Sequence, residues 1–132
     1  MQSKFSCDRG FSLIEVIFIA TIIGILSATA LSHFAAYRQR SFDTRSLNDI
    51  RSAAMGEESY FMENEHYVDC LGSIPCASVL PGFNPSDGVV ISMFQVTGSG
   101  PEYFTGQAYH LQGSRNTAET AFIWNSSNSG LQ

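Results

Sequence analysis

One carboxylate lies inside the apolar N-terminal part of this chain. The stretch RGFSLIEVIFIATIIGIL, residues 9–26, contains Glu15, and no Lys, Arg or His between Phe11 and Ser32 can neutralise it. A carboxylate at membrane depth costs up to about 3 kcal/mol, so a charge there usually has a partner. Ser12 and Glu15 also fit the helix-capping pattern S-x-x-E, which is a purely local role. Glu15 is therefore either part of a helix cap or half of an ion pair.

A cut in the chain would create a partner for Glu15. If the bond after Gly10 is cleaved, Phe11 carries a new α-amine, which is largely protonated at neutral pH because its unperturbed pKa is near 8. Pairing with Glu15 of the same helix is awkward geometrically, whereas a neighbouring copy at a similar depth can offer its carboxylate naturally. The spacing of Gly10, Phe11 and Glu15 therefore favours self-assembly.

Cys70 and Cys76 are close enough in sequence to close a small loop. Such a disulfide is expected of a domain in an oxidising compartment, although pairing cannot be read from spacing alone and two free thiols are the alternative. Cys7 is separate, close to the N-terminus. The cysteines favour an N-terminus inside the cell and a domain outside it.

Catalytic and metal-binding patterns are missing from the sequence. His33, His66 and His110 are scattered, and no zinc spacing, phosphate loop or nucleophile motif occurs. A group of acids, Glu57, Glu58, Glu63 and Glu65, is most simply a solvated face near a helix end. We expect no catalytic residue, no metal site and no cofactor, and therefore no enzyme.

The apolar run from Phe11 to Leu31 is long enough to cross a bilayer, which takes about 20 residues as a helix. A buried helix of a soluble domain is the first alternative, but the polar remainder is a poor cover for a helix that is apolar all round. A cleaved secretory signal is the second, but its apolar part would be shorter. The sequence predicts a membrane span to about residue 32.

The helix is expected to continue well beyond the span. Residues 11–66 contain no proline, and apolar residues recur at helical spacing. These are Phe34, Tyr37, Leu47, Ile50, Ala54 and Phe61. A single helix over 11–66 follows, membrane-spanning at first and amphipathic after residue 32.

The rest of the chain predicts a small antiparallel sheet. Three β-branched and aromatic runs, 88–98, 102–111 and 120–126, are separated by turn residues and form a meander. Residues 67–87, rich in Pro and Gly, are expected to be an irregular loop. The outer half of the helix is expected to be covered by apolar side chains of these runs, namely Val89, Ile91, Phe94, Phe122 and Trp124. The predicted fold class is α+β, a long N-terminal helix packed on about three strands in the globular part, residues 88–132.

Charge and length narrow the classes of partner. The 132 residues suit one small domain, and the formal net charge is −5. After residue 10, five arginines face eleven Asp or Glu side chains. Nucleic acid is therefore an unfavourable main partner, because phosphate binding requires positive charge.

The N-terminal residues carry a family resemblance. RGFSLIEVIFIATIIGILSA, together with Phe34 and the following AYRQR, resembles the type III signal and N-terminal helix of type IV pilins and of type II secretion pseudopilins. The resemblance implies that a prepilin peptidase removes residues 1–10 as a leader by cutting between Gly10 and Phe11, and methylates the amine of Phe11. It also implies that Glu15 draws in the next subunit. Many relatives have proline where this chain has Ser32.

The resemblance implies a structural role. The expected function is a pilin subunit, held in the inner membrane by one span and in contact with lipid before it assembles, and later part of an extracellular pilus filament. Expected partners are copies of itself, the prepilin peptidase and the inner-membrane assembly machinery. A type II secretion pseudopilin is one alternative, and a signal-anchored periplasmic binding module is an alternative of another class.

Overall fold

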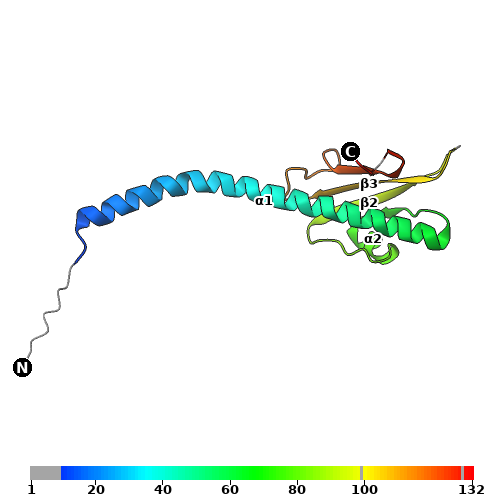
Figure 1. The fold of residues 1–132 in the computed structure, drawn as a ribbon, viewed down its shortest axis with the longest axis horizontal. Coiled ribbons are helices and arrows are strands. Elements are labelled where there is room, and N and C mark those ends of the chain that lie inside the picture. Colours follow the sequence, from blue (N-terminus) through cyan, green and yellow to red (C-terminus); the bar gives the residue numbers. More distant parts are fainter. Residues whose placement is uncertain (1–9, 99, 129) are drawn as a thin grey trace, which may run out of the picture. The chain divides into compact units, whose positions relative to one another are not determined.

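The computed structural model describes residues 10–98, 100–128 and 130–132. A long helix, a short helix and an antiparallel sheet give the α+β class that the sequence predicts (Figure 1). The elements are α1 (Leu13–Asn64), β1 (Cys70–Leu71), α2 (Ser73–Val79), β2 (Val89–Val96), β3 (Tyr103–His110), β4 (Phe122–Asn125), the 3-10 helix η1 (Ser126–Asn128) and β5 (Gly130–Leu131). The predicted leader, residues 1–10, lies outside the described residues except for Gly10.

The chain divides into two compact units, which we describe separately. The first ends at Ala36, and its described part is the beginning of α1 with the three residues before it. The second, Tyr37–Gln132, holds the rest of α1, together with α2 and the sheet. Helix α1 includes residue 32, where no proline interrupts its hydrogen bonds. We call Tyr37–Gln132 the globular unit.

The sheet is a meander of five strands in the order β1-β2-β3-β4-β5, all antiparallel. Strands β2 and β3 form its longest ladder, from Val89 opposite His110 to Val96 opposite Tyr103. The three predicted runs correspond to β2, β3 and β4, but the expected number of three strands was wrong. The two missed strands, β1 and β5, have two residues each, which is too short for a repeating pattern to reveal.

The two-residue strands lie at the two edges of the sheet. Beyond β1, the backbone N–H of Gly72 donates to the carbonyl of Ile91, and the Ser73 hydroxyl donates to the carbonyl of Val89. Next to β5, the N–H of Gln132 donates to the carbonyl of Ile123 at 2.9 Å. Backbone carbonyls of β2 and β4 thus accept hydrogen bonds from turn and terminal residues.

Residues 67–87, expected to be irregular, contain β1 and the seven-residue helix α2. Pro75 lies within the first turn of α2, where a missing N–H breaks no hydrogen bond. Gly72 precedes the helix with a φ of 93°, which favours glycine. Proline and glycine here begin a helix, so their presence did not mark a structureless loop.

The core of the globular unit lies between α1 and the sheet. Ile50, Ala53 and Ala54 of α1 are buried against residues of β2 and β3. Full burial of large apolar side chains such as Phe104 stabilises the fold by roughly 1.5–3 kcal/mol each. Gly106 on β3 leaves room for the thioether of Met93, because a Cβ there would lie 2.5 Å from its sulfur. The outer part of α1 and the sheet therefore bury each other.

The buried face of β2 differs from the expected one. Val89, Ile91 and Met93 are buried, whereas Phe94 is 37% exposed. Successive side chains in a strand point to opposite faces, so the residue that follows Val89 and Ile91 on the core side is Met93. The prediction that Phe94 covers the outer part of the helix was therefore wrong. Trp124 does pack against the core, partly buried.

Candidate assembly site

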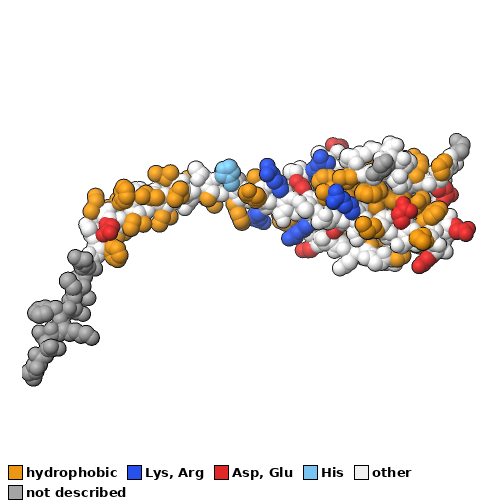
Figure 2. Space-filling model, in the orientation of Figure 1, with side chains coloured by type: hydrophobic (Ala, Val, Ile, Leu, Met, Phe, Trp, Pro, Cys, Tyr) orange, Lys and Arg blue, Asp and Glu red, His pale blue; other side chains and the backbone are white. Residues whose placement is uncertain are grey.

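The candidate site is the first unit, residues 10–36. The apolar side chains of its helix are exposed on every side, and an 18-residue window of it has no residue buried in the structure. Figure 2 shows these hydrophobic side chains along the segment. The helix is long and apolar enough to cross a membrane, by length and composition alone. So much exposed apolar surface requires lipid or other copies of the helix around it.

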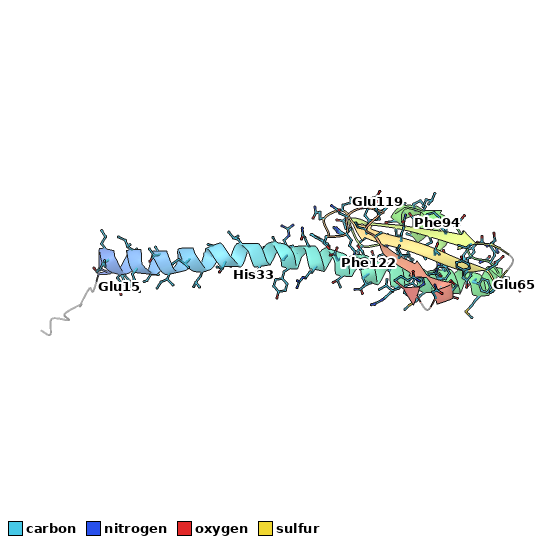
Figure 3. The ribbon with its side chains drawn as sticks, turned by 90° about the horizontal axis from the view of Figure 1, so that it is seen from above. Glu15, His33, Glu65, Phe94, Glu119 and Phe122 are labelled. Carbon is cyan, nitrogen blue, oxygen red and sulfur yellow. A yellow bond between two sulfur atoms is a disulfide. The ribbon has the colours of Figure 1, made fainter. Side chains whose placement is uncertain are left out.

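Glu15 lies in the first turn of α1 and is exposed (Figure 3). Helix hydrogen bonding starts when the N–H of Val16 donates to the carbonyl of Ser12, at 3.2 Å. Among the described residues, nothing donates a hydrogen bond to the Glu15 carboxylate, so the capping box with Ser12, one of the two alternatives for Glu15, is not formed. The negative charge of Glu15 lies near the positive end of the helix dipole, which is a favourable interaction. In this part of the chain, the carboxylate is left available to another molecule.

Gly10 and Phe11 precede the helix and are exposed. No atom lies within 4 Å of the position that a Cβ on Gly10 would occupy. The side chain of Phe11 is 79% exposed and lines a shallow apolar groove along the helix, with Val16, Ile19, Ala20 and Ile23. The peptide bond between Gly10 and Phe11 is therefore accessible.

Threonine hydroxyls inside the apolar segment are satisfied by their own helix. The hydroxyl of Thr21 donates to the carbonyl of Phe18 at 2.8 Å, and that of Thr29 donates to the carbonyl of Leu26 at 3.0 Å. Such local bonds remove the cost of an unpaired hydroxyl in lipid. Within the described part of the span, Glu15 is thus the group that most needs a partner.

Glu57 departs from the solvated face that its sequence neighbours indicated. Its side chain is fully buried on α1, whereas Glu58, Glu63 and Glu65 are exposed as expected. One carboxylate oxygen accepts a hydrogen bond from the N–H of Val68 at 3.2 Å, and the other has no partner in the structure. Burial is the main cause that raises the pKa of Glu57 to about 7. The assignment of Glu57 to a solvated face was wrong.

Sequence reasoning overlooked the helical spacing of Glu57. Ile50, Ala53 and Glu57 are three and four residues apart, which places all three on one face of α1. Ile50 and Ala53 are both fully buried. The signal was therefore available in the spacing, but the charged residue type outweighed it.

Two aspartates of α1 hold loops of the globular unit in place. Asp49, only 6% exposed, accepts hydrogen bonds from the backbone N–H of Ser86 at 2.7 Å and from its hydroxyl at 3.0 Å. Asp43 accepts from the backbone N–H groups of Ser114 and Arg115. These contacts join α1 to residues far along the chain, which sequence spacing cannot reveal.

Cys70 and Cys76 are joined by a disulfide with a Cα–Cα distance of 5.0 Å. It links β1 to α2, and both residues are buried in the core. Cys7 lies outside the described residues. The bridge therefore secures a short strand and a short helix that have few other constraints.

The histidines do not form a site together. His110 is buried and stacks on Phe42 with ring centroids 4.3 Å apart, and His66 contacts Tyr60 edge to face. His33 lies on α1 (Figure 3). Among residues 10–98, 100–128 and 130–132, no group of three or more His, Cys, Asp or Glu side chains is arranged to hold a metal ion.

The N-terminal segment matches a known family. The family described as "Prokaryotic N-terminal methylation motif" matches residues 5–31. The major type IV pilin protein PilA of Myxococcus xanthus is 32% identical over 81 residues, which are 61% of this chain and 34% of that relative. A fimbrial protein of Pseudomonas aeruginosa is 33% identical over 61 residues, 46% of this chain and 40% of the relative.

The N-terminal part of the chain is therefore similar to that of type IV pilins. Another relative is the type II secretion system core protein G of Escherichia coli, 25% identical over 60 residues, 46% of this chain and 41% of the relative. The chain spans less than half of the length of each of these relatives. The named relatives are a major pilin, a fimbrial protein and a secretion-system component.

Proposed function

We propose that this chain is a structural subunit of a type IV pilus filament. It is made as a precursor in the inner membrane, cut between Gly10 and Phe11, methylated on the amine of Phe11 and then polymerised through its N-terminal helix. The similarity to a major type IV pilin and to a fimbrial protein, together with the matched methylation motif, supports this role. No catalytic step is assigned to the chain itself.

One observation carries the proposal most directly. Glu15 is exposed and unpartnered among the described residues, four positions after Phe11 in an exposed apolar helix. Cleavage at the accessible Gly10–Phe11 bond supplies the missing cation, since the new amine is largely protonated. Packed helices exclude water, so an amine of one copy facing Glu15 of the next is stabilised and fixes the register.

The partners follow from the same steps. Other copies surround the apolar helix in the filament, and lipid surrounds it before assembly. The prepilin peptidase cuts and methylates the chain, and the inner-membrane assembly machinery lifts it into an extracellular pilus. Within the globular unit, the disulfide between Cys70 and Cys76 suits the oxidising side of the membrane.

The role of Glu15 is tested by comparing E15A with E119A in a strain that lacks the native subunit. Glu119 is an exposed carboxylate of the globular unit, so its removal controls for a simple loss of charge. Electron microscopy should show abundant filaments for E119A and few or none for E15A, with equal amounts of precursor in the membrane. Normal filaments from E15A would refute the role of Glu15.

Mass spectrometry of the membrane-bound form tests the processing step. The expected N-terminus is Phe11 carrying one methyl group. An intact, unmethylated N-terminus would favour the alternative of a signal-anchored periplasmic binding module.

A type II secretion pseudopilin is the second candidate, favoured by the similarity to core protein G. The same processing and the same use of Glu15 would apply to both. Gene neighbourhood and filament length separate them, because secretion genes and short filaments would indicate the pseudopilin.

A further inference from the structure

Charged side chains of the globular unit are sorted along its length. All of its Lys and Arg residues are arginines on or beside the first part of α1 in this unit, and Figure 2 shows them gathered there. We call them the arginine collar: Arg38, Arg40, Arg45, Arg51 and Arg115, all exposed. Arg115 joins this group because its backbone N–H donates to Asp43 on α1.

The opposite end carries only negative charge. We call its exposed carboxylates the acidic end: Glu58, Glu63, Glu65, Asp69 and Glu102. Glu102 belongs to this end because it lines one pocket with Glu58. Gln95 joins it to Asp69, since its N–H donates to Asp69 at 2.6 Å and its side chain donates to Glu102 at 3.5 Å. The arginines and the carboxylates thus lie toward opposite ends of the unit and meet only at Arg51 and Glu58.

Guanidinium groups of the collar contact aromatic rings rather than carboxylates in the described residues. Arg38 and Arg45 lie over the ring of Phe42, and Arg115 lies over the ring of Phe122 at 4.4 Å. Among the described residues, no arginine of the collar forms an ion pair with a carboxylate. A guanidinium over an aromatic ring keeps its charge, and its hydrogen-bond donors stay available.

Four carboxylates lie near the five arginines of the collar, so its formal net charge is only slightly positive, but acids among them are engaged with loop residues rather than with the guanidinium groups. Asp43 and Asp49 accept hydrogen bonds from loop residues Ser114 and Ser86. Asp87 and Glu119 are the exposed acids near this end. Arg51 lines one pocket with Glu58, so the collar and the acidic end meet there. The hydrogen bonds that the acidic end receives from Tyr67 and Gln95 come from neutral donors.

We propose that the acidic end of one copy docks on the arginine collar of another copy, which adds a head-to-tail contact between globular units to the helix contacts of the filament. This inference rests on the proposed function, because it takes assembly of the chain for granted. Within one copy, the middle of the collar and the acidic end are about 25 Å apart along α1, by the rise of 1.5 Å per residue. That distance exceeds the screening length of about 8 Å in physiological salt, so, apart from Arg51 and Glu58, which line one pocket, the two ends do not neutralise each other.

A second copy is the occupant that both ends require. Each copy offers one acidic end and one collar, so the contact is heterologous and repeats without closing, as a helical filament needs. Anionic lipid headgroups would also attract the collar, but they would repel the acidic end. The contact between copies therefore accounts for both features.

Charge reversal tests the contact in the full chain. R38E/R40E places acids on the collar, and E63R/E65R places arginines on the acidic end. We expect each variant alone to lower filament yield by at least about tenfold, since like charges then face each other. A variant with all four reversals restores opposite charges between copies and should recover most of the yield.

The controls separate folding from docking. Equal membrane levels of each variant and an intact disulfide, measured by thiol labelling, establish that the globular unit has formed. Normal yield from both single-end reversals, while wild type polymerises and E15A does not, would overturn the docking contact but leave the proposed function in place. Failure of the four-fold variant to recover would also overturn it and would point to lipid as the partner of the collar.

Cross-linking locates the contact directly. Lys4, in the predicted leader, is the only lysine of the sequence, so carbodiimide has no lysine to couple in the processed chain. R38K/R40K keeps the charge and adds amines at the collar. A mixture of isotopically labelled and unlabelled copies should give cross-links between positions 38 or 40 of one copy and residues 58–69 or 102 of another. Filaments of this variant without such links would contradict the proposed contact.

Discussion

Glu57 provides the sharpest test of the packing described above, because an ionisable group is fully buried beside α1. Burial raises its pKa to about 7, against an ordinary value of 4.5. The folded chain therefore holds this proton more tightly than the unfolded chain does. Stability from this effect is fully present below about pH 4.5 and is lost as the pH rises through about 7.

The size of the effect follows from the two pKa values. A pKa difference of one unit corresponds to about 1.36 kcal/mol, so the free energy of unfolding should fall by about 2–3 kcal/mol between about pH 5 and pH 8. The neighbouring acids Asp69 and Glu58 add to this penalty, while the N–H of Val68 reduces it. E57Q keeps the shape of the side chain but cannot ionise, so it should remove the decline.

Urea unfolding of the full chain in detergent, at a series of pH values, measures this decline in the free energy of unfolding. Trp124 is the only tryptophan and packs against the core, so its fluorescence reports on the globular unit. We expect E57Q to match wild type near pH 5 and to be the more stable protein near pH 8. E63Q is the matched control, because Glu63 is exposed on the same helix and is not among the groups that shift the pKa of Glu57. Equal pH dependence of E57Q and wild type would refute the reasoning.

Two further substitutions probe other contacts. C70S/C76S removes a disulfide that closes a loop with a sequence separation of 6; it should lower the free energy of unfolding by about 2 kcal/mol, and reduced wild type should show the same loss in urea. D49A leaves the N–H and hydroxyl of Ser86 without their buried acceptor; it should cost about 2–3 kcal/mol, measured against N48A at an exposed neighbouring position, and an equal loss from both variants would contradict the assigned role.

Local patterns in the sequence predicted the main elements. The apolar run and the absence of proline over 11–66 predicted the helix, because both act within a few residues along the chain. The β-branched runs predicted β2, β3 and β4 for the same reason. Short strands such as β1 and β5 depend on partners distant in sequence, so no local pattern marks them.

Contacts across the fold explain the remaining errors. Phe94 was chosen for its size, whereas the two-residue period of the strand selects Met93. Glu57 was placed in solvent by residue type, whereas its position on α1 places it in the core. In the candidate site, the lack of an internal partner for Glu15 follows from composition alone. Its partner in another copy is a property of the assembly and stays a prediction.

The covered sheet edges bear on how this chain polymerises. Open strand edges recruit strands of other molecules and lead to disordered aggregates or amyloid. Here the outermost strands have only two residues each, and Gly72, Ser73 and Gln132 occupy carbonyls next to them. In the proposed assembly, where the subunit is concentrated in a membrane and then packed against its copies, these short edges protect it from the competing, irreversible route of strand addition.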